Sequence, residues 1–210
     1  MKVLGNALGK EMVKGEFEGA KAINAIIPNN CPKPLAHGTY VSDSGYHFFL
    51  CDFADMDDEM PSAEEFVNVV VQLHQNSQSP TGKFGFHVTT HAGDHPLQTA
   101  WTDSWEEFFT RQMREEILWE RDVQGPNEEM ESLVQQMFEK VIPRLLRPLQ
   151  TGGRSIKPTL VHGDLWHGNV GVDIDGDRPI LFDPCACYAH NECKSTPRLL
   201  KRMGRLMRPR

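Results

Sequence analysis

The sequence predicts an α+β fold, with a small, strand-rich N-terminal lobe at residues 1–54 and a mostly helical C-terminal lobe at 55–193. The first observation is a turn flanked by β-branched and aromatic residues at 38–51, which is typical of a β-hairpin. The second is a pair of segments within 104–147 whose apolar residues recur at helical spacing. The third is a strand–loop–strand unit at 160–184, where two short apolar runs each end in polar residues.

Three strands and one helix are expected in the N-terminal lobe. Lys2-Val-Leu opens the chain as a short strand. Residues 11–27 have the pattern of a helix, which ends at the Pro-Asn-Asn that follows. Two strands are predicted at 38–42 and 46–51, and the Asp-Ser-Gly between them supplies the backbone angles of a tight turn.

Capping patterns mark the helices of the C-terminal lobe. Ser62 with Glu65 three residues later forms a capping box ahead of an apolar-periodic segment. Asp103, which also has a glutamate three residues later, is the predicted cap of the next helix. A Gly-Pro break separates that helix from the following one, which we expect to start at Asn127.

Polar residues gather in the two loops of the strand–loop–strand unit. His162-Gly-Asp164 follows the first apolar run, Asn169 comes five residues after Asp164, and Asp183 ends the second run. Asp-x4-Asn is the spacing of the protein-kinase catalytic loop. Phosphoryl transfer needs a carboxylate that receives the acceptor proton, together with an amide oxygen and a second carboxylate that hold metal ions. The pattern therefore indicates a kinase; the alternative is a polar hairpin with turn aspartates.

The motifs around these residues resemble one kinase family more closely than kinases in general. The segments 162–170 (His-Gly-Asp-Leu-Trp-His-Gly-Asn-Val), 181–184 (Leu-Phe-Asp-Pro) and 188–190 (Tyr-Ala-His) resemble the fructosamine kinase family, also called ketosamine-3-kinases or protein-ribulosamine kinases. The resemblance implies a bilobal, protein-kinase-like fold related to that of aminoglycoside and choline kinases. It also implies ATP-dependent phosphorylation of the 3-hydroxyl of ketosamines, which are sugar adducts on lysines.

The resemblance assigns a role to each polar residue of the unit. Asp164 is the expected catalytic base, and Asn169 and Asp183 are the expected magnesium ligands. Trp166 matches the tryptophan on which the sugar rests. Two histidines complete the substrate set: His162 and His190. The expected cofactors are ATP and Mg²⁺, and the expected acceptor is a ketosamine-modified protein or a free ketosamine. A kinase of choline or of an aminoglycoside is the alternative enzyme on this fold.

Nucleotide contacts are expected in the N-terminal lobe. Kinases pair a strand lysine, which touches the phosphates, with a glutamate on the following helix. Lys2 and Glu16 stand in family-like Lys-Val and Gly-Glu contexts; the alternatives are a frayed terminal lysine and a solvated helix face. The resemblance assigns the adenine-binding hinge to four residues: Cys51, Asp52, Phe53 and Ala54. An ordinary strand leading into an acidic loop is the alternative for them.

Both ends depart from the family pattern. No Gly-rich loop precedes Lys2, and the resemblance stops at about Cys193. Residues 194–210 then carry seven Lys and Arg and no acid. We therefore expect a kinase truncated at both ends, with little or no turnover; the alternative is a non-catalytic relic that binds nucleotide or a partner. The tail is interpreted as a stretch of altered reading rather than an amphipathic segment that binds acidic lipids.

Composition and charge exclude several classes of protein. The net charge is −7 and all 29 acidic residues lie before the tail, so the body of the chain does not suit nucleic acid. No apolar run reaches membrane-spanning length, and no secretory signal opens the chain. Five cysteines without framework spacing then indicate reduced thiols and a cytoplasmic protein. The sequence does not define the oligomeric state.

Three clusters of potential metal ligands are interpreted without metal. Three histidines recur every four residues, but the intervening glycine and threonines favour a loop over one helix face: His87, His91 and His95. Four soft ligands fall close together in a spacing unlike that of zinc sites: Cys185, Cys187, His190 and Cys193. The acidic run at 173–177 lacks the bidentate glutamate of a calcium loop and is predicted to be a hairpin turn.

Overall fold

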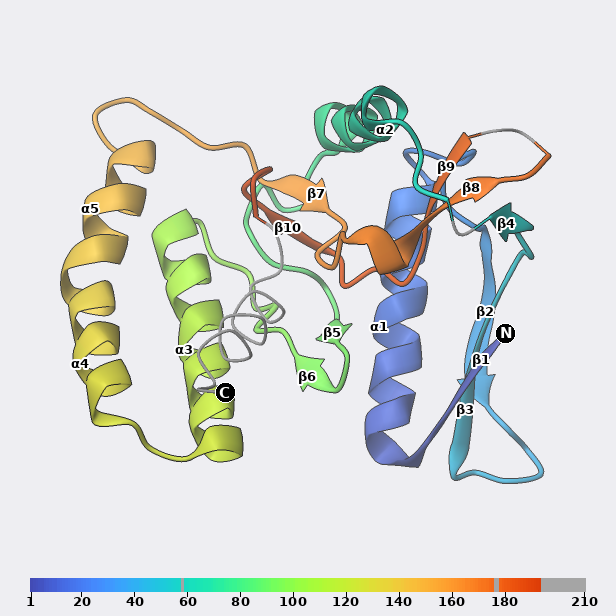
Figure 1. Ribbon diagram of the computed structural model, residues 1–210, viewed down its shortest axis with the longest axis horizontal. Helices are drawn as coiled ribbons and strands as arrows, with labels where there is room; N and C mark the ends of the chain where they lie inside the picture. The colour runs from blue at the N-terminus through green and yellow to red at the C-terminus, as the bar shows by residue number, and fades with distance from the viewer. Residues whose placement is uncertain (58, 176–177, 194–210) are drawn as a thin grey trace.

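The computed structural model describes residues 1–57, 59–175 and 178–193, and Figure 1 shows how their helices and strands are arranged. Small antiparallel sheets pack against two of the helices, and the other helices lie at one end of the molecule (Figure 1), in keeping with the predicted α+β fold. The interpretation of residues 194–210 concerns a segment outside the described residues. Within the described ranges, no helix is long and apolar enough to cross a membrane.

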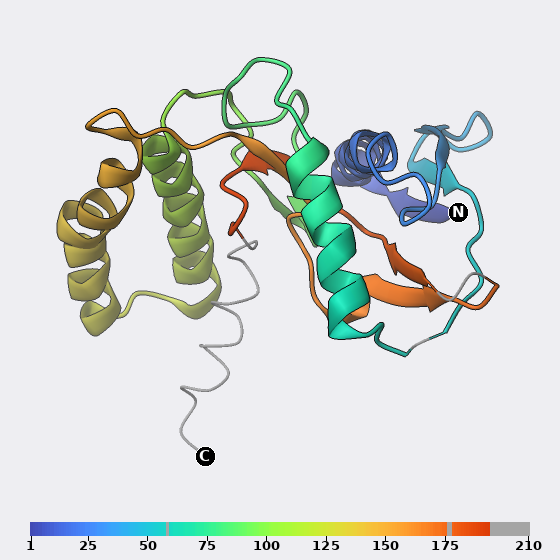
Figure 2. The same ribbon diagram turned by 90° about the horizontal axis from the view of Figure 1, so that it is seen from above.

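A three-stranded antiparallel sheet and one long helix form the N-terminal part. The strands β1 (Lys2–Gly5), β2 (Pro34–Thr39) and β3 (Tyr46–Cys51) lie in the order β1–β3–β2. Helix α1 (Asn6–Asn24) runs along this sheet, as both views show (Figures 1 and 2). A small core joins helix and sheet: Val13, Ala20 and Phe49. The predicted hairpin is therefore present, although its first strand starts and ends earlier than expected.

Helix α1 begins at Asn6, earlier than its apolar pattern predicts. Asn6 has a φ of 65°, in the left-handed region that asparagine tolerates better than most residues. Its Oδ1 accepts a hydrogen bond from the Gly9 amide at 3.2 Å and so caps the first turn. A Cβ at Gly9 would come within 2.9 Å of the Leu4 Cβ. Glycine at this position thus permits the sharp connection from β1 into the helix.

Two further pieces of sheet carry the polar loops. Strand β7 (Thr159–Val161) pairs antiparallel with β10 (Cys187–Ala189). Strand β8 (Val170–Asp173) pairs with β9 (Arg178–Leu181) on one side and with β4 (Met56–Asp57) on the other. β8 and β9 are antiparallel neighbours in the chain, as the predicted hairpin requires, and residues 176–177 between them lie outside the described residues.

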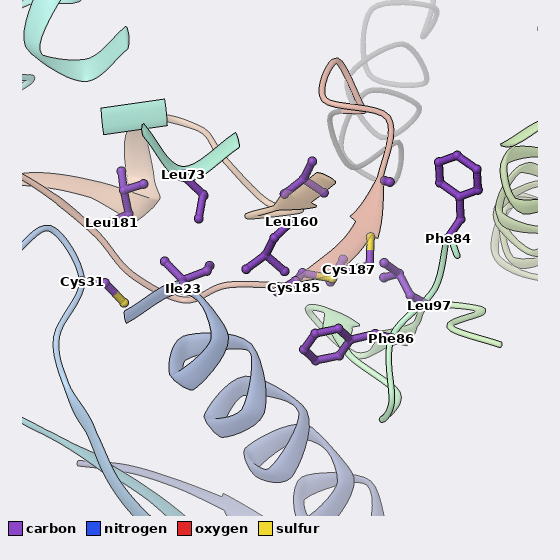
Figure 3. Close-up of a cluster of buried hydrophobic side chains, with 14 of the residues drawn as sticks. Ile23, Cys31, Leu73, Phe84, Phe86, Leu97, Leu160, Leu181, Cys185 and Cys187 are labelled. Atoms are coloured by element: carbon purple, nitrogen blue, oxygen red, sulfur yellow. The ribbon is translucent and has the colours of Figure 1, made fainter. Parts of the chain in front are cut away.

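Helix α2 (Ala63–Asn76) packs on these strands and helps to close the main core. It begins with the predicted capping box, in which the Ser62 hydroxyl accepts from the Glu65 amide at 3.3 Å. The buried cluster in Figure 3 draws side chains from α1, α2, β7, β9 and the segment after β9: Ile23, Leu73, Leu160, Leu181 and Cys185. Because α1 contributes to this cluster, the helix is anchored to the strands that carry the polar loops.

Helix α3 (Trp105–Gln124) is the first of the helices at the end of the molecule away from the N-terminal sheet (Figure 1). Ser104 caps it, because its hydroxyl accepts from the Glu107 amide at 3.2 Å. The predicted cap at Asp103 is therefore wrong by one residue. The Asp103 carboxylate instead lies 2.9 Å from Nζ of Lys83, in the loop that follows α2.

An irregular helical run packs beside α3. Four segments follow one another: α4 (Glu128–Gln136), a π-helical turn η1 (Met137–Val141), α5 (Ile142–Leu146) and a 3₁₀ turn η2 (Arg147–Gln150). Asn127 caps the start of the run, as predicted. Pro143 has no N–H to continue the regular hydrogen-bond ladder, which accounts for the π turn beside it. On the outer face, Leu133 and Leu145 are 60% and 61% exposed, so apolar surface is bare there.

Candidate active site

Two loops meet back to back where β7 and β9 end. After β7 the chain turns at Gly163, whose φ of 81° lies in the left-handed region that favours glycine. A Cβ at this position would collide with the carbonyl oxygen of Cys185. The Cys185 amide in turn donates to the carbonyl of His162 at 2.9 Å. Direct backbone contact therefore holds the two loops together, and glycine at position 163 permits it.

Asp164 and Asn169 contact each other within the first loop. Nδ2 of Asn169 donates to the Asp164 carbonyl at 2.8 Å and to its carboxylate Oδ2 at 3.0 Å. Both residues are buried, with 7% and 5% of their surface exposed. The 3₁₀ turn η3 (His167–Asn169) closes the loop. Because Nδ2 is committed to Asp164, the amide oxygen Oδ1 is the part of Asn169 left to meet a cation.

Asp183 is presented at the end of β9 by an uncommon backbone conformation. Its φ is 54°, a left-handed value that Asp and Asn adopt more readily than other side chains. The amide of Phe182 donates to the carbonyl of Asn169 at 3.1 Å, which ties the second loop to the first. The Asp183 side chain is 51% exposed, in contrast to the buried Asp164. One buried and one accessible carboxylate thus stand on adjoining loops.

Lys2 reaches this site from β1. Its Nζ lies 2.7 Å from Oε2 of Glu16 and 3.5 Å from Oδ1 of Asp183. Burial raises the pKa of Glu16 to about 7, and the Lys2 cation opposes this rise. Burial acts to lower the pKa of Lys2, but the two carboxylates outweigh it and the pKa is raised. Lys2 is therefore charged at neutral pH, and the expected lysine–glutamate pair lies beside Asp183.

The oxygen donors at the two loops suit magnesium. Magnesium prefers oxygen ligands and is usually bound by one or two carboxylates together with phosphate oxygens of a substrate. The Asp183 carboxylate and Oδ1 of Asn169 are donors of this kind. Among the residues that the structure describes, no three His, Cys, Asp or Glu side chains are placed to hold a metal ion by themselves. A magnesium ion here would therefore need further oxygen ligands, such as those of a nucleotide.

The expected hinge residues cross from one sheet to another. β3 ends at Cys51, and the next strand, β4, pairs with β8 in the second part of the molecule. The Asp52 amide donates to the Lys33 carbonyl at 2.9 Å. Beyond it Phe53 is 90% exposed, and Ala54 follows. The segment connects the two sheets; its role as a hinge between lobes and the binding of adenine by its backbone both stay predictions.

Trp166 lies in the loop between Asp164 and Asn169, with its indole against Gly168. A Cβ at Gly168 would come within 2.6 Å of the indole Cη2, so a larger residue there would displace the ring. His167 meets the ring edge-on at a centroid distance of 4.6 Å. Trp166 remains 39% exposed. The contact with sugar stays a prediction, and a partly exposed ring beside Asp164 is compatible with it.

His162 lies behind the loop rather than on its surface. It is 2% exposed, and its Nε2 donates to the Phe182 carbonyl at 3.0 Å. Burial lowers the pKa of His162 to about 4, against the opposing effect of this carbonyl. Among the described residues, no hydrogen-bond partner meets its Nδ1, so a second proton would add a buried, unpaired charge. This geometry makes His162 a support for the segment that ends in Asp183, rather than a residue open to substrate.

The buried, neutral His162 predicts acid sensitivity. Its pKa of about 4 in the folded state lies below the ordinary value of 6.5, so in this window the unfolded chain binds the proton and the folded chain does not. Stability is then lost as pH falls from 6.5 to about 4, by at most about 3 kcal/mol. Urea unfolding across this range should show a steeper loss in the native chain than in a His162→Gln variant.

Glu16 must be controlled for in this measurement, because its titration changes stability with pH in the opposite direction to that of His162. Its pKa of about 7 exceeds the ordinary 4.5, so the folded chain holds the proton and stability falls as pH rises through that window. The histidine comparison is therefore best made in a Glu16→Gln background. Equal pH profiles for the two chains there would contradict the assignment of a buried neutral His162.

His190 does not lie with these residues. It directly follows β10, which is antiparallel to β7, with Ala189 opposite Thr159 at the start of β7. Asp164 follows the other end of β7, so His190 and Asp164 are at opposite ends of the strand pair. The His190 ring packs on Trp105 at a centroid distance of 5.8 Å. The predicted substrate contact of His190 stays a prediction that the structure does not connect to the site.

Other potential metal ligands have different surroundings. His87 lies in a loop with its Nε2 3.1 Å from Glu18. The other two histidines stand in a small hairpin of β5 (His91–Ala92) and β6 (His95–Pro96), not on one helix face. Burial raises the pKa of three thiols and so disfavours the thiolate form that binds zinc: Cys185, Cys187 and Cys193.

Asn30 has a structural role that the sequence pattern does not predict. Its Nδ2 donates to the Pro179 carbonyl at 2.8 Å, and its own carbonyl accepts from the Leu181 amide at 2.8 Å. Asn30 therefore pins the loop after α1 to β9, the strand that delivers Asp183. In the sequence it stands out only as part of a helix-ending Pro-Asn-Asn, and such a turn gives no sign of a partner far along the chain.

Comparison with known proteins gives a consistent picture. The family described as fructosamine kinase matches residues 3–196. A chloroplastic protein-ribulosamine 3-kinase of Arabidopsis thaliana is 27% identical over 193 residues, which cover 89% of this chain and 54% of that protein. A ketosamine-3-kinase of Mus musculus is 28% identical over 215 residues, covering 91% of this chain and 66% of that protein. The chain spans about half the length of the plant relatives that it matches.

Two solved structures share the fold. One, from Haemophilus somnus 129PT, carries the provisional name fructosamine-3-kinase; it superposes with a TM-score of 0.65 at 19% identity, over 100% of this chain and 68% of the other. Another with that provisional name, from Thermobifida fusca YX-ER1, gives a TM-score of 0.67 at 21% identity, over 86% of this chain and 57% of the other. The expected kinase-like α+β architecture is thereby confirmed.

Proposed function

The chain belongs to the fructosamine kinase family, and from that premise we propose that it phosphorylates the sugar 3-hydroxyl of a ketosamine with ATP as the phosphate donor. The observation that carries the proposal is the meeting of separate segments at one place. The Lys2–Glu16 pair comes from β1 and α1, Asp164 and Asn169 follow β7, and Asp183 follows β9. This set has the composition that phosphoryl transfer requires.

Asp164 acts on the acceptor in this proposal. Its carboxylate orients the sugar hydroxyl and takes up the proton that the hydroxyl loses. Asn169 holds Oδ2 of this carboxylate at 3.0 Å and so fixes its orientation. Trp166 next to it offers a partly exposed ring on which a sugar could rest. The acceptor is a ketosamine on a protein lysine or a free ketosamine.

The Lys2–Glu16 pair and Asp183 act on the phosphate side. Lys2 donates to phosphate oxygens, and Glu16 holds its Nζ at 2.7 Å so that the cation stays directed toward Asp183. Asp183 and the amide oxygen of Asn169 would hold magnesium, which, when bound, screens the charge on the phosphates. The exposure of the Asp183 side chain leaves it accessible to such a ligand.

The test is a phosphate-transfer assay with a ribulosamine or fructosamine adduct of lysine as acceptor. We expect slow ATP-dependent formation of a sugar 3-phosphate, in keeping with the low turnover that the sequence predicts; the product is identified by its phosphorus–proton couplings in NMR. Choline and an aminoglycoside, given in parallel, should not be phosphorylated. An Asp164→Asn chain prepared in the same way controls for contaminating kinases. Transfer to either alternative acceptor in preference to the ketosamine would reject the proposal, and magnesium–ATP binding without any transfer by a folded chain would favour the non-catalytic alternative.

A further inference from the structure

We propose that Thr90 is a positioning residue of this site, which holds α1, and with it Glu16, against the segment that follows Asp183. Its importance for catalysis rests on the proposed phosphoryl transfer. The contacts that carry the inference lie behind the site and can be tested without turnover.

Thr90 is fixed on two sides in the interior of the molecule. It is 0% exposed, and its hydroxyl donates to the carbonyl of Ala186 at 3.1 Å. Its own carbonyl accepts from the Leu97 amide at 2.8 Å. Ala186 is also 0% exposed, and a buried carbonyl needs a donor. Thr90 thus links the loop before β5 to the segment three residues beyond Asp183.

Helix α1 packs directly against Thr90 and Ala186 through two glycines that lie one helical turn apart. A Cβ at Gly15 would collide with the Thr89 carbonyl oxygen and approach the Thr90 Cα to 3.2 Å. A Cβ at Gly19 would lie 3.2 Å from the Ala186 Cβ. Glycine is a poor helix former, and the close packing at Gly15 and Gly19 explains why it occurs within this helix. The helix therefore touches both partners of the Thr90–Ala186 hydrogen bond.

The contact of α1 with Thr90 and Ala186 determines the position of the Lys2–Glu16 pair. Glu16 follows Gly15 directly and holds Lys2 at 2.7 Å, and Lys2 lies 3.5 Å from Asp183. A shift of α1 away from Thr90 would carry Glu16 away from Asp183. A displacement of about 1 Å at a catalytic group can cost roughly 100-fold in rate. A buried hydroxyl with no direct part in the reaction would thus govern the geometry of the phosphate side.

A matched pair of substitutions tests this role. Thr90→Val keeps the shape of the side chain and removes the hydroxyl, whereas Thr90→Ser keeps the hydroxyl. We expect Thr90→Val to lose the nuclear Overhauser contacts between the Lys2 and Asp183 side chains, whose charged atoms lie 3.5 Å apart in the native chain, and to bind magnesium–ATP about tenfold more weakly. Thr90→Ser should keep the contacts and the affinity. Both properties are measured on chains that denaturation shows to be folded.

A steric variant keeps the test decisive if Thr90→Val does not fold. Gly15→Ala pushes α1 off the Thr89 carbonyl from the other side, and Lys14→Ala, at an exposed position of the same helix, is its control. Unchanged Lys2–Asp183 contacts in folded Thr90→Val or Gly15→Ala would overturn the proposal, because Thr90 would then serve stability alone. If the native chain binds no nucleotide, the proposed function fails, and the side-chain contacts still decide the role of Thr90.

Discussion

Asp164→Asn should lower the rate of phosphate transfer by about 10²- to 10⁴-fold, the usual contribution of a general base, and leave magnesium–ATP affinity close to that of the native chain. The expectation follows from the position of Asp164 in a buried loop, where Asn169 bonds its Oδ2 at 3.0 Å. An asparagine at 164 has the same shape, and its amide oxygen can accept the same bond. The loop is therefore kept while the proton acceptor is lost. Single-turnover transfer and calorimetric nucleotide binding, measured on one preparation, separate the two effects.

Asp173→Asn is the matched control for this experiment. Asp173 is similarly buried, at 8% exposed, but lies in β8 and pairs with Arg178 at 2.7 Å. Its substitution should lower stability without selective loss of the transfer step. Near-native transfer by Asp164→Asn would remove Asp164 from the mechanism. Loss of nucleotide binding by the same variant would show that Asp164 acts on the nucleotide and not on the acceptor.

Local patterns were enough to predict the geometry of the Asp164–Asn169 loop. The relation between Asp164 and Asn169 depends on five residues of chain, so the motif and the hydrogen bond between them are parts of one local structure. The capping box at Ser62 and the cap at Asn127 were predictable for the same reason. Lys2 and Glu16 are 14 residues apart, yet one strand and the next helix join them, and the structure places them in contact.

Features that depend on distant partners could not be predicted in this way. The pairing of β10 with β7 puts His190 at the end away from Asp164, and nothing near His190 in the sequence encodes that register. Asp103 pairs with Lys83 of another segment while its neighbour Ser104 caps the helix, and Asn30 has a partner at position 179. In each case the deciding contact lies in another element, and an isolated segment contains no trace of it.

Substitution of Asp183 should weaken or abolish the magnesium dependence of ATP binding, and the choice of replacement decides whether the result can be interpreted. Loss of outer partners of a metal ligand typically costs about 10- to 100-fold in metal affinity, so loss of a ligand should cost at least as much. The backbone at Asp183 has a φ of 54°. Alanine there would add strain of roughly 1–2 kcal/mol to the loss of the carboxylate. Asparagine and glycine both accept this conformation. Asparagine removes only the charge, whereas glycine removes the whole side-chain ligand.

We therefore expect a graded series in calorimetric titrations with and without magnesium. Asp183→Asn should keep a weak magnesium effect through its amide oxygen, and Asp183→Gly should show none. Asp183→Ala should match the glycine variant in binding but unfold at lower urea concentration, because it alone carries the backbone strain. The accessible position of this side chain, 51% exposed and 3.5 Å from Lys2, means that its removal leaves no buried cavity to confuse the comparison. A magnesium effect of native size in Asp183→Gly would exclude Asp183 as a metal ligand. The Asp183 carboxylate would then act only through its ion pair with Lys2.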